Sequence, residues 1–152
     1  MCLDTITPRK PKESGTGWKV FEKRKTKLFS DVFGEGVPIP ENKWVHEDKY
    51  REQYFKHKKF ICVYDEGLAG EGVKIFEYPF GWHVFKHKKD AEEWALMGDN
   101  MEVRKIKYRR ACVQGKQELA SVKRDKIMSS IVVAKEIFII PKKETKGGND
   151  ES

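Results

Sequence analysis

An apolar run near the C-terminus constrains the fold more than any other feature of the chain. Residues 131–140, IVVAKEIFII, are mostly β-branched, and Pro141 follows them. This composition favours a largely buried strand that stops at the proline, which cannot donate a ladder hydrogen bond. Lys135 and Glu136 interrupt the run. Because neighbouring side chains of a strand point to opposite faces, at least one of these charges is expected near a site, a sheet edge or a bulge.

Several other segments have the composition of strands and are bounded by glycine, proline or charged residues. One short helix is expected after Asp90, which can cap it, with an apolar stripe around Trp94 and an end at Gly98. Residues 47–59 are expected to add a few helical turns. The sequence therefore predicts an α+β fold, with a mostly antiparallel twisted sheet of about five to seven strands and one or two short helices. The clearest strand segments are 17–23, 43–46, 60–64, 73–78, 82–85, 101–113 and 127–140.

The length of 152 residues favours a single domain. Pro8 and Pro11, in a polar setting, predict an extended N-terminal arm over residues 1–16. The α+β domain is expected to cover residues 17–141. The polar residues 142–152 have the composition of a disordered tail.

Positive charge is concentrated in two blocks of a chain whose net charge is +7. Residues 1–30 hold eight basic and three acidic residues, and residues 101–126 hold nine and three. Residues 31–100 are acidic on balance, with ten basic and fourteen acidic residues. Basic blocks attract nucleotides, nucleic acid or an acidic protein. A solvated lysine-rich surface that only keeps the protein soluble is the alternative interpretation.

Three features that the sequence lacks indicate the cellular compartment. The three cysteines show no Cys-x-x-Cys spacing, and the N-terminus has no apolar segment typical of a secretory signal. No apolar run approaches the length of about 18 residues that a membrane span needs. We therefore expect a cytoplasmic protein with no membrane partner; the oligomeric state stays open.

No motif indicates a metal or a cofactor. His83 and His87 would lie about 13 Å apart along a strand, too far to share one ion. The glycine loops 34–36 and 67–72 match no nucleotide-binding fingerprint and are interpreted as turns. Cys2 is a minor candidate for an N-terminal nucleophile after removal of Met1.

His83 is the first candidate site residue. If Trp82 and Val84 face the core, strand alternation places His83 and Phe85 on the other face. If that face lines a cleft, His83 can serve as a ligand or a base; on an ordinary sheet surface it is a half-exposed ring beside Phe85. Tyr78, at the end of the preceding strand, is the aromatic residue expected to stack on a ligand.

The second candidate is a row of cations on the strand 101–113. Lys105, Lys107 and Arg109 share one face, where they can bind phosphates. Glu136 is expected to line one common hollow together with these cations and His83. A change of face along this strand also indicates a bulge or a twist near Arg104 and Lys105. The alternative is an outer sheet face that the acidic middle of the chain neutralises.

Three blocks carry a resemblance: MCLDT at 1–5, GWHVFKHKKDAEEW at 81–94 and VVAKEIFII at 132–140. Together they resemble a loose group of small phage and bacterial proteins of unassigned function. That resemblance implies an accessory or counter-defence role in the host cytoplasm, with a host protein or a nucleotide signal as the partner. The element order is also similar to an ADP-ribosyltransferase core, in which Glu136 would stand at the late glutamate of that family. The Ser-Thr-Ser segment of that family is here His83 to Lys86.

The leading functional prediction is a small basic protein that binds an anionic, nucleotide-like ligand. A nucleic-acid-binding accessory protein is the first alternative. An enzyme that transfers ADP-ribose or hydrolyses its substrate is the second, with His83 and Glu136 as its catalytic candidates. The predicted ligand-binding residues are His83, Tyr78, Lys105, Lys107, Arg109 and Glu136.

Overall fold

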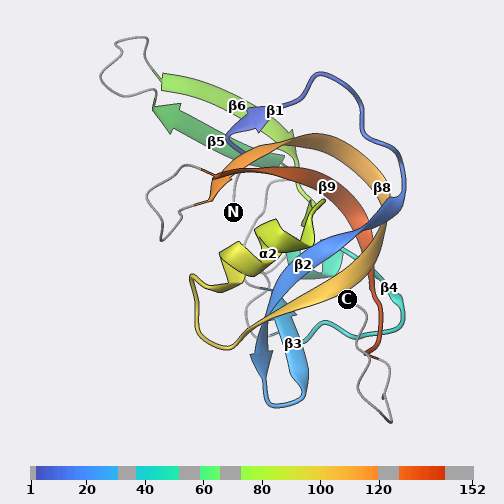
Figure 1. Cartoon of the computed structure of the whole chain (residues 1–152). Helices are drawn as coiled ribbons and strands as arrows, with labels where there is room; N and C mark the ends of the chain where they lie inside the picture. Colours follow the sequence, from blue (N-terminus) through green and yellow to red (C-terminus); the bar gives the residue numbers. More distant parts are fainter. Residues whose placement is uncertain (1–2, 31–36, 52–58, 66–72, 120–126, 143–152) are drawn as a thin grey trace.

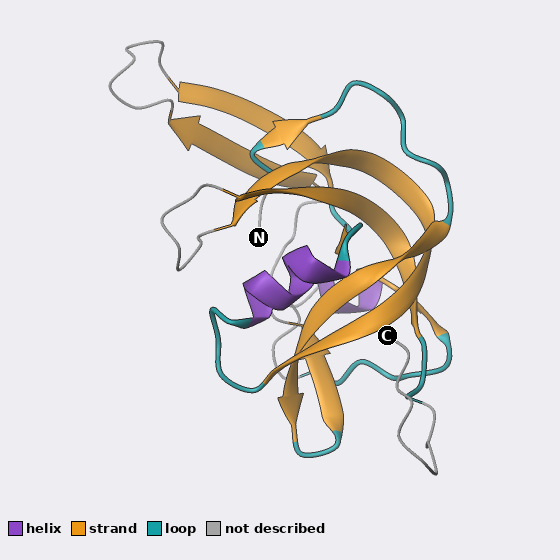
Figure 2. Cartoon of the chain, viewed as in Figure 1, coloured by secondary structure: helices purple, strands orange, loops and turns teal. Residues whose placement is uncertain are grey.

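The computed structural model describes residues 3–30, 37–51, 59–65, 73–119 and 127–142. These residues form an α+β fold with a twisted, mostly antiparallel seven-stranded sheet, a two-stranded sheet and two short helices (Figures 1 and 2). The fold class predicted from the sequence is confirmed. The elements are β1 (Thr5–Ile6), β2 (Gly15–Arg24), β3 (Lys27–Ser30), β4 (Trp44–His46), α1 (Asp48–Arg51), β5 (Lys59–Asp65), β6 (Val73–Pro79), β7 (Trp82–Phe85), α2 (Lys88–Ala95), β8 (Met101–Leu119) and β9 (Ile127–Ile139).

The long strand β8 organises the larger sheet. Its residues 101–108 pair with β2, and its residues 106–119 pair with β9. β9 also pairs with β7, and β7 meets β2 at the bridge between Trp18 and Phe85. The path β8–β2–β7–β9 therefore closes on itself, with β1, β3 and β4 attached at its margins (Figure 1).

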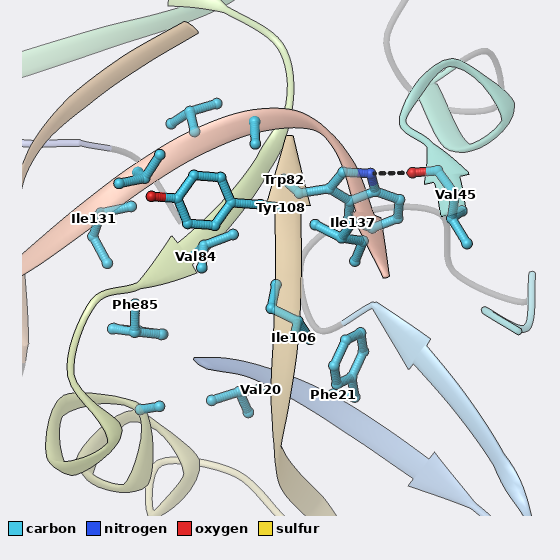
Figure 3. Packing of buried hydrophobic residues seen from close by; sticks show 14 of the residues in the cluster. Val20, Phe21, Val45, Trp82, Val84, Phe85, Ile106, Tyr108, Ile131 and Ile137 are labelled. Atoms are coloured by element: carbon cyan, nitrogen blue, oxygen red, sulfur yellow. Dashed lines mark hydrogen bonds between the residues drawn. The ribbon is translucent and has the colours of Figure 1, made fainter. Parts of the chain in front are cut away.

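Apolar side chains from these strands pack against one another, as Figure 3 shows. Burying each large side chain contributes about 1.5–3 kcal/mol. The Trp82 ring meets the Tyr50 ring edge-on at 5.1 Å, and its Nε1 donates a hydrogen bond of 3.2 Å to the Val45 carbonyl. β4 and α1 are thus fixed to the core. Its fully buried members include Phe21, Phe85, Ile106, Ile131 and Ile137.

Every strand predicted from the sequence is present. Those predicted at 43–46, 60–64, 73–78 and 82–85 lie within one residue of the observed bounds. β8 differs, because it continues from the predicted end at Val113 to Leu119. The sequence 114–119 is polar, but it pairs with β9 along one edge and partly with β1 along the other. Tertiary pairing therefore overrides its composition.

The helix α2 begins earlier than predicted. His87 is its N-cap residue, so Asp90 lies in the first turn and does not cap the helix. The Asp90 carboxylate still lies near the positive end of the helix dipole. Ala91 is fully buried, as the predicted apolar stripe requires.

The bulge of β8 does not lie near Arg104 and Lys105, where the sequence indicated a bulge or a twist. The register between β2 and β8 is continuous through residues 101–108, and the irregularity lies between Ala111 and Val113. Arg110, just before it, has φ of 55°, a left-handed conformation that is uncommon for residues with side chains.

Part of the predicted N-terminal arm forms a strand of the sheet. Residues Thr5 and Ile6, inside the predicted arm 1–16, form β1 and pair with Lys116 and Gly115. Leu3 is only 1% exposed. The residues of the predicted tail from 143 onward lie outside the described part of the chain. No helix within the described ranges is long and apolar enough to cross a membrane.

Candidate functional site

A row of cations lies on one face of β8, as predicted. Lys105 and Lys107 are exposed, and the Arg109 side chain is 44% exposed. Cross-strand pairs in a sheet share a face. Because Lys105 pairs with Trp18 and Lys107 pairs with Phe138, these two aromatic residues lie on the same face as the cations. β4 extends this face, since Trp44 pairs with Phe138.

Each cation of the row contacts an aromatic ring. Lys105 Nζ lies 5.8 Å from the centre of the Trp18 ring, and Lys107 Nζ lies 5.5 Å from that of Phe138. The Arg109 guanidinium lies 4.1 Å from the centre of the Trp44 ring. Such contacts are cation–π interactions. We call the six residues the cation–ring face: Trp18, Trp44, Lys105, Lys107, Arg109 and Phe138.

The rings of this face were not predicted as site residues. Trp18 is partly buried and packs against the core. The strand register places Phe138 beside Lys107 and Trp44 beside Phe138, which brings both rings onto the cation–ring face. The only sequence signal was the tryptophan next to a lysine at residues 43–44.

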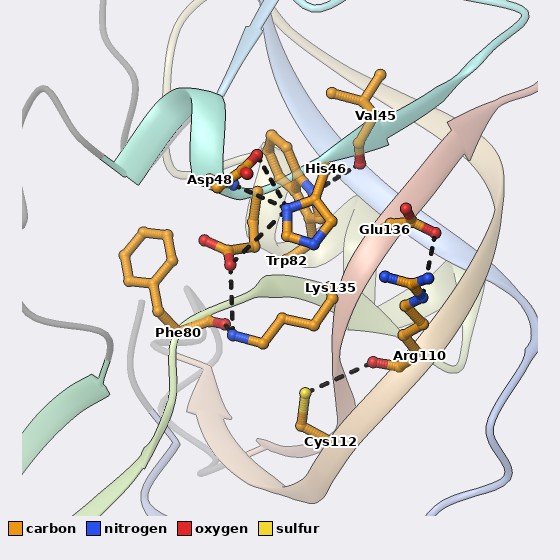
Figure 4. Close-up of polar contacts among 10 residues, drawn as sticks. Val45, His46, Asp48, Phe80, Trp82, Arg110, Cys112, Lys135 and Glu136 are labelled. Carbon is orange, nitrogen blue, oxygen red and sulfur yellow. Dashed lines mark hydrogen bonds and ion pairs between the residues drawn. The ribbon is translucent and has the colours of Figure 1, made fainter.

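Glu136 is the acidic residue within this face. It pairs with Arg109 across the strands, and its Oε2 accepts a hydrogen bond from Arg109 Nε. Arg110 Nε also lies 3.9 Å from Oε2 (Figure 4), although strict alternation along β8 would point Arg109 and Arg110 to opposite faces. The bulge that follows Arg110 accounts for this change. The hydrogen bond from Arg109 lowers the pKa of Glu136, and the charges of both arginines and of His46 act in the same direction.

Lys135, the other charge of the apolar run, is held differently. Its Nζ donates to the Phe80 carbonyl and lies 3.4 Å from the Glu47 carboxylate, which is almost fully buried (Figure 4). Both charges of the run are therefore explained by partners, and Glu136 is the one at the exposed face.

His83 and Tyr78 form a separate, buried group. His83 is 1% exposed, and its Nε2 lies 2.9 Å from the Tyr78 hydroxyl. The Leu3 backbone amide donates to the same hydroxyl at 3.0 Å, so the tyrosine proton is available for His83. Lys19, also buried, donates to the His83 carbonyl at 3.1 Å. Burial, followed by the charge of Lys19, holds the pKa of His83 well below its ordinary value.

The six predicted site residues thus divide into two groups. Lys105, Lys107, Arg109 and Glu136 share one face of the sheet, on which Glu136 itself is only 9% exposed. His83 pairs with Val133, three residues from Glu136, so strand alternation points the two side chains to opposite faces. The prediction of one hollow shared by His83 and Glu136 is therefore not met. In this position His83 is neutral and acts as a buried hydrogen-bonding group that fixes Tyr78.

A shallow hollow adjoins the cation–ring face at Trp44. Its volume is about 340 Å³, and the residues that line it include Pro38, Pro40, Lys43, Trp44 and His46. Tyr50 also lines it and is only 3% exposed. Asp48 Oδ1 lies 3.0 Å from Nδ1 of His46 (Figure 4).

No group of three or more histidine, cysteine or acidic side chains within the described ranges could hold a metal ion. Cys112 is half-buried, and burial raises the pKa of its thiol. Cys2 and the glycine loops 34–36 and 67–72 lie outside the residues that the structure describes.

Comparisons with protein-family models, curated proteins and solved structures find no match to the chain. The resemblance to phage and bacterial proteins, and the counter-defence role it implies, therefore stay predictions. Function has to be argued from the cation–ring face itself.

Proposed function

We propose that the cation–ring face binds single-stranded nucleic acid. The observation that carries this proposal is the contact of each cation of the row on β8 with an aromatic ring from another strand of the same sheet. Proteins that bind single strands combine cations that follow the backbone with rings on which bases stack. Alternate residues of β8 place the cations about 6.6 Å apart in a row.

The exposure of this face favours a polymer over an enclosed small ligand. Lys105 and Lys107 are exposed along the strand, and the buried His83 contributes nothing to their surroundings. The rings favour a single strand over a duplex, because the bases of a duplex are already stacked on each other. Acidic charge on the face is limited by the contacts of Glu136 with two arginines.

Calorimetric titration with an unlabelled 12-nucleotide single strand and with the matching duplex tests this proposal. We expect saturable binding to the single strand at low salt, weaker binding to the duplex, and an affinity that falls as salt rises. Replacing Lys105 and Lys107 together by alanine should reduce the slope of log K against log salt by about 1.4, at about 0.7 per phosphate contact.

A matched variant removes two lysines elsewhere. Lys23→Ala with Lys27→Ala also lowers the net charge by two, but these exposed residues lie in the β2–β3 hairpin, where Lys23 pairs with Leu28 and Lys27 pairs with Arg24. Its affinity should stay close to that of the wild type once the small effect of net charge is considered. Equal losses in the two double variants, or no binding at low salt, would contradict the proposal.

A further inference from the structure

The hollow beside Trp44 is continuous with the cation–ring face. Trp44 lines the hollow, and its ring also contacts Arg109 at 4.1 Å and Phe138 at 5.6 Å. A strand that follows the row from Lys105 to Arg109 would reach the hollow at Trp44. The face therefore has a concave end.

The chemistry of the lining fits one nucleotide. Lys43 and Lys49, both exposed, line the hollow and can pair with a phosphate. The Trp44 ring, with Pro38 and Pro40, offers apolar surface to a base. The volume of about 340 Å³ is at the lower end of the roughly 300–1,000 Å³ that small-molecule sites occupy.

Part of the lining of the hollow is fixed by contacts with the core. The Tyr50 hydroxyl donates to the Pro38 carbonyl at 3.3 Å, and the Tyr50 ring packs against Trp82. Trp82 in turn donates to the carbonyl of Val45, which also lines the hollow. A site fixed in this way loses little conformational freedom when it binds a ligand.

The acidic side chains near the hollow are already paired with basic side chains. Asp48 lies 3.0 Å from His46 Nδ1, and the buried Glu47 carboxylate lies 3.4 Å from Lys135 Nζ. The exposed charges that line the hollow are thus the two lysines, which favours an anion.

From this geometry we infer that the hollow binds the terminal nucleotide of the single strand, with its phosphate at Lys43 and Lys49 and its base against Trp44. This inference rests on the proposed function, because the rest of the strand lies on the cation–ring face. It adds a preference for strand ends that the face alone does not supply.

The first test is an NMR titration of the full chain with adenosine 5′-monophosphate, which is too short to cover the row of cations. We expect weak binding, with a dissociation constant of about 1 mM, and amide shifts centred on residues 38–50. Adenosine, which lacks the phosphate, should bind less tightly. Replacing Lys43 and Lys49 by alanine should remove the difference between the two ligands, whereas replacing Lys105 and Lys107 should preserve it. No shifts at residues 38–50, or the same affinity after loss of Lys43 and Lys49, would overturn the inference.

The second test compares a linear and a circular 12-nucleotide strand by calorimetry. The linear strand should bind about five- to tenfold more tightly, and the Lys43 and Lys49 variant should lose that advantage while its affinity for the circle is unchanged. Equal affinities for the linear and circular strands would overturn the inference and leave the proposed function standing. A chain that binds the mononucleotide but no strand would overturn both.

Discussion

The Arg109 guanidinium lies 4.1 Å from the centre of the Trp44 ring, although the two residues belong to strands that are not neighbours. β9 separates β4 from β8 and supplies Phe138, whose ring lies 5.6 Å from Trp44. Three strands thus contribute to two linked contacts, one between Arg109 and Trp44 and one between Trp44 and Phe138. This contact also joins the row of cations to the hollow.

Trp44 is therefore expected to dominate binding. Trp44→Ala should reduce the affinity for a single strand about five- to 150-fold, which corresponds to the loss of about 1–3 kcal/mol of stacking on one base. Trp44→Phe keeps a ring and should recover much of the loss. Calorimetry with the 12-nucleotide strand measures both variants. An affinity of Trp44→Ala equal to that of the wild type would show that bases do not stack here.

Glu136 is expected to weaken binding, because it places a negative charge between two arginines. Glu136→Gln should raise the affinity for a single strand about two- to fivefold at low salt, the size of a partly screened surface interaction of about 0.4–1 kcal/mol. An enzyme in which Glu136 is catalytic would instead lose turnover with no gain in binding. The titration is made at pH 7, where the wild-type carboxylate is ionised.

The same variant should change the pH dependence of stability. The pKa of Glu136 is lowered in the folded state, chiefly by the hydrogen bond from Arg109, so the unfolded chain binds more protons in acid. The stabilisation is complete above the unfolded pKa of about 4.3 and is lost as the pH falls towards the folded value. Urea unfolding from pH 3 to 6 should show a shallower loss for Glu136→Gln. Glu102, whose pKa is also lowered, acts in both proteins and cancels in the comparison.

His83 should affect stability and not binding. Its pKa is lowered in the folded state, mainly by burial, so the unfolded chain takes up its proton first as the pH falls below about 6.5. The stabilisation is therefore present above this pH and is lost progressively below it. His83→Gln should be destabilised at pH 7 by about 1–3 kcal/mol, because the buried Tyr78 hydroxyl loses the imidazole nitrogen that accepts its proton, and should show less change between pH 7 and pH 5.

The exposed His87 supplies the control for that experiment, since His87→Gln removes a histidine without disturbing a buried contact. Its stability should follow the wild type at both pH values. A loss of strand affinity in a folded His83→Gln protein would contradict the assignment of His83 to the interior.

Gly115 is expected to be essential for attaching the N-terminal strand. A Cβ at this position would lie 2.0 Å from the Thr5 carbonyl oxygen, which is backbone and cannot move aside without breaking the β1 pairing. Gly115→Ala should lower the free energy of unfolding by more than about 1 kcal/mol and increase hydrogen exchange in residues 3–7.

Gly98→Ala is the matched comparison. Its Cβ would lie 2.7 Å from the terminal methyl of the Met101 side chain, which can rotate away. Its stability should therefore change much less. Similar losses for the two alanine variants would show that contact with the Thr5 backbone is not the cause.

The strands that the sequence predicted are those whose apolar side chains alone require burial. Residues 82–85 and the run around Ile137 are β-prone and had to form buried strands wherever they paired. Alternation along β8 likewise placed Lys105, Lys107 and Arg109 on one face without any knowledge of the neighbouring strands. These properties depend on residues close together in the chain, so local rules suffice.

The register between distant strands decided the rest. Trp44 and Phe138 join the cations because β4 pairs with β9 and β9 pairs with β8, and no local pattern specifies those pairings. His83 is buried because Tyr78 and the N-terminal segment cover it. Side-chain type fixes which groups can interact, but contacts between residues far apart in the chain are set by how the whole sheet closes, and only the tertiary structure contains that information.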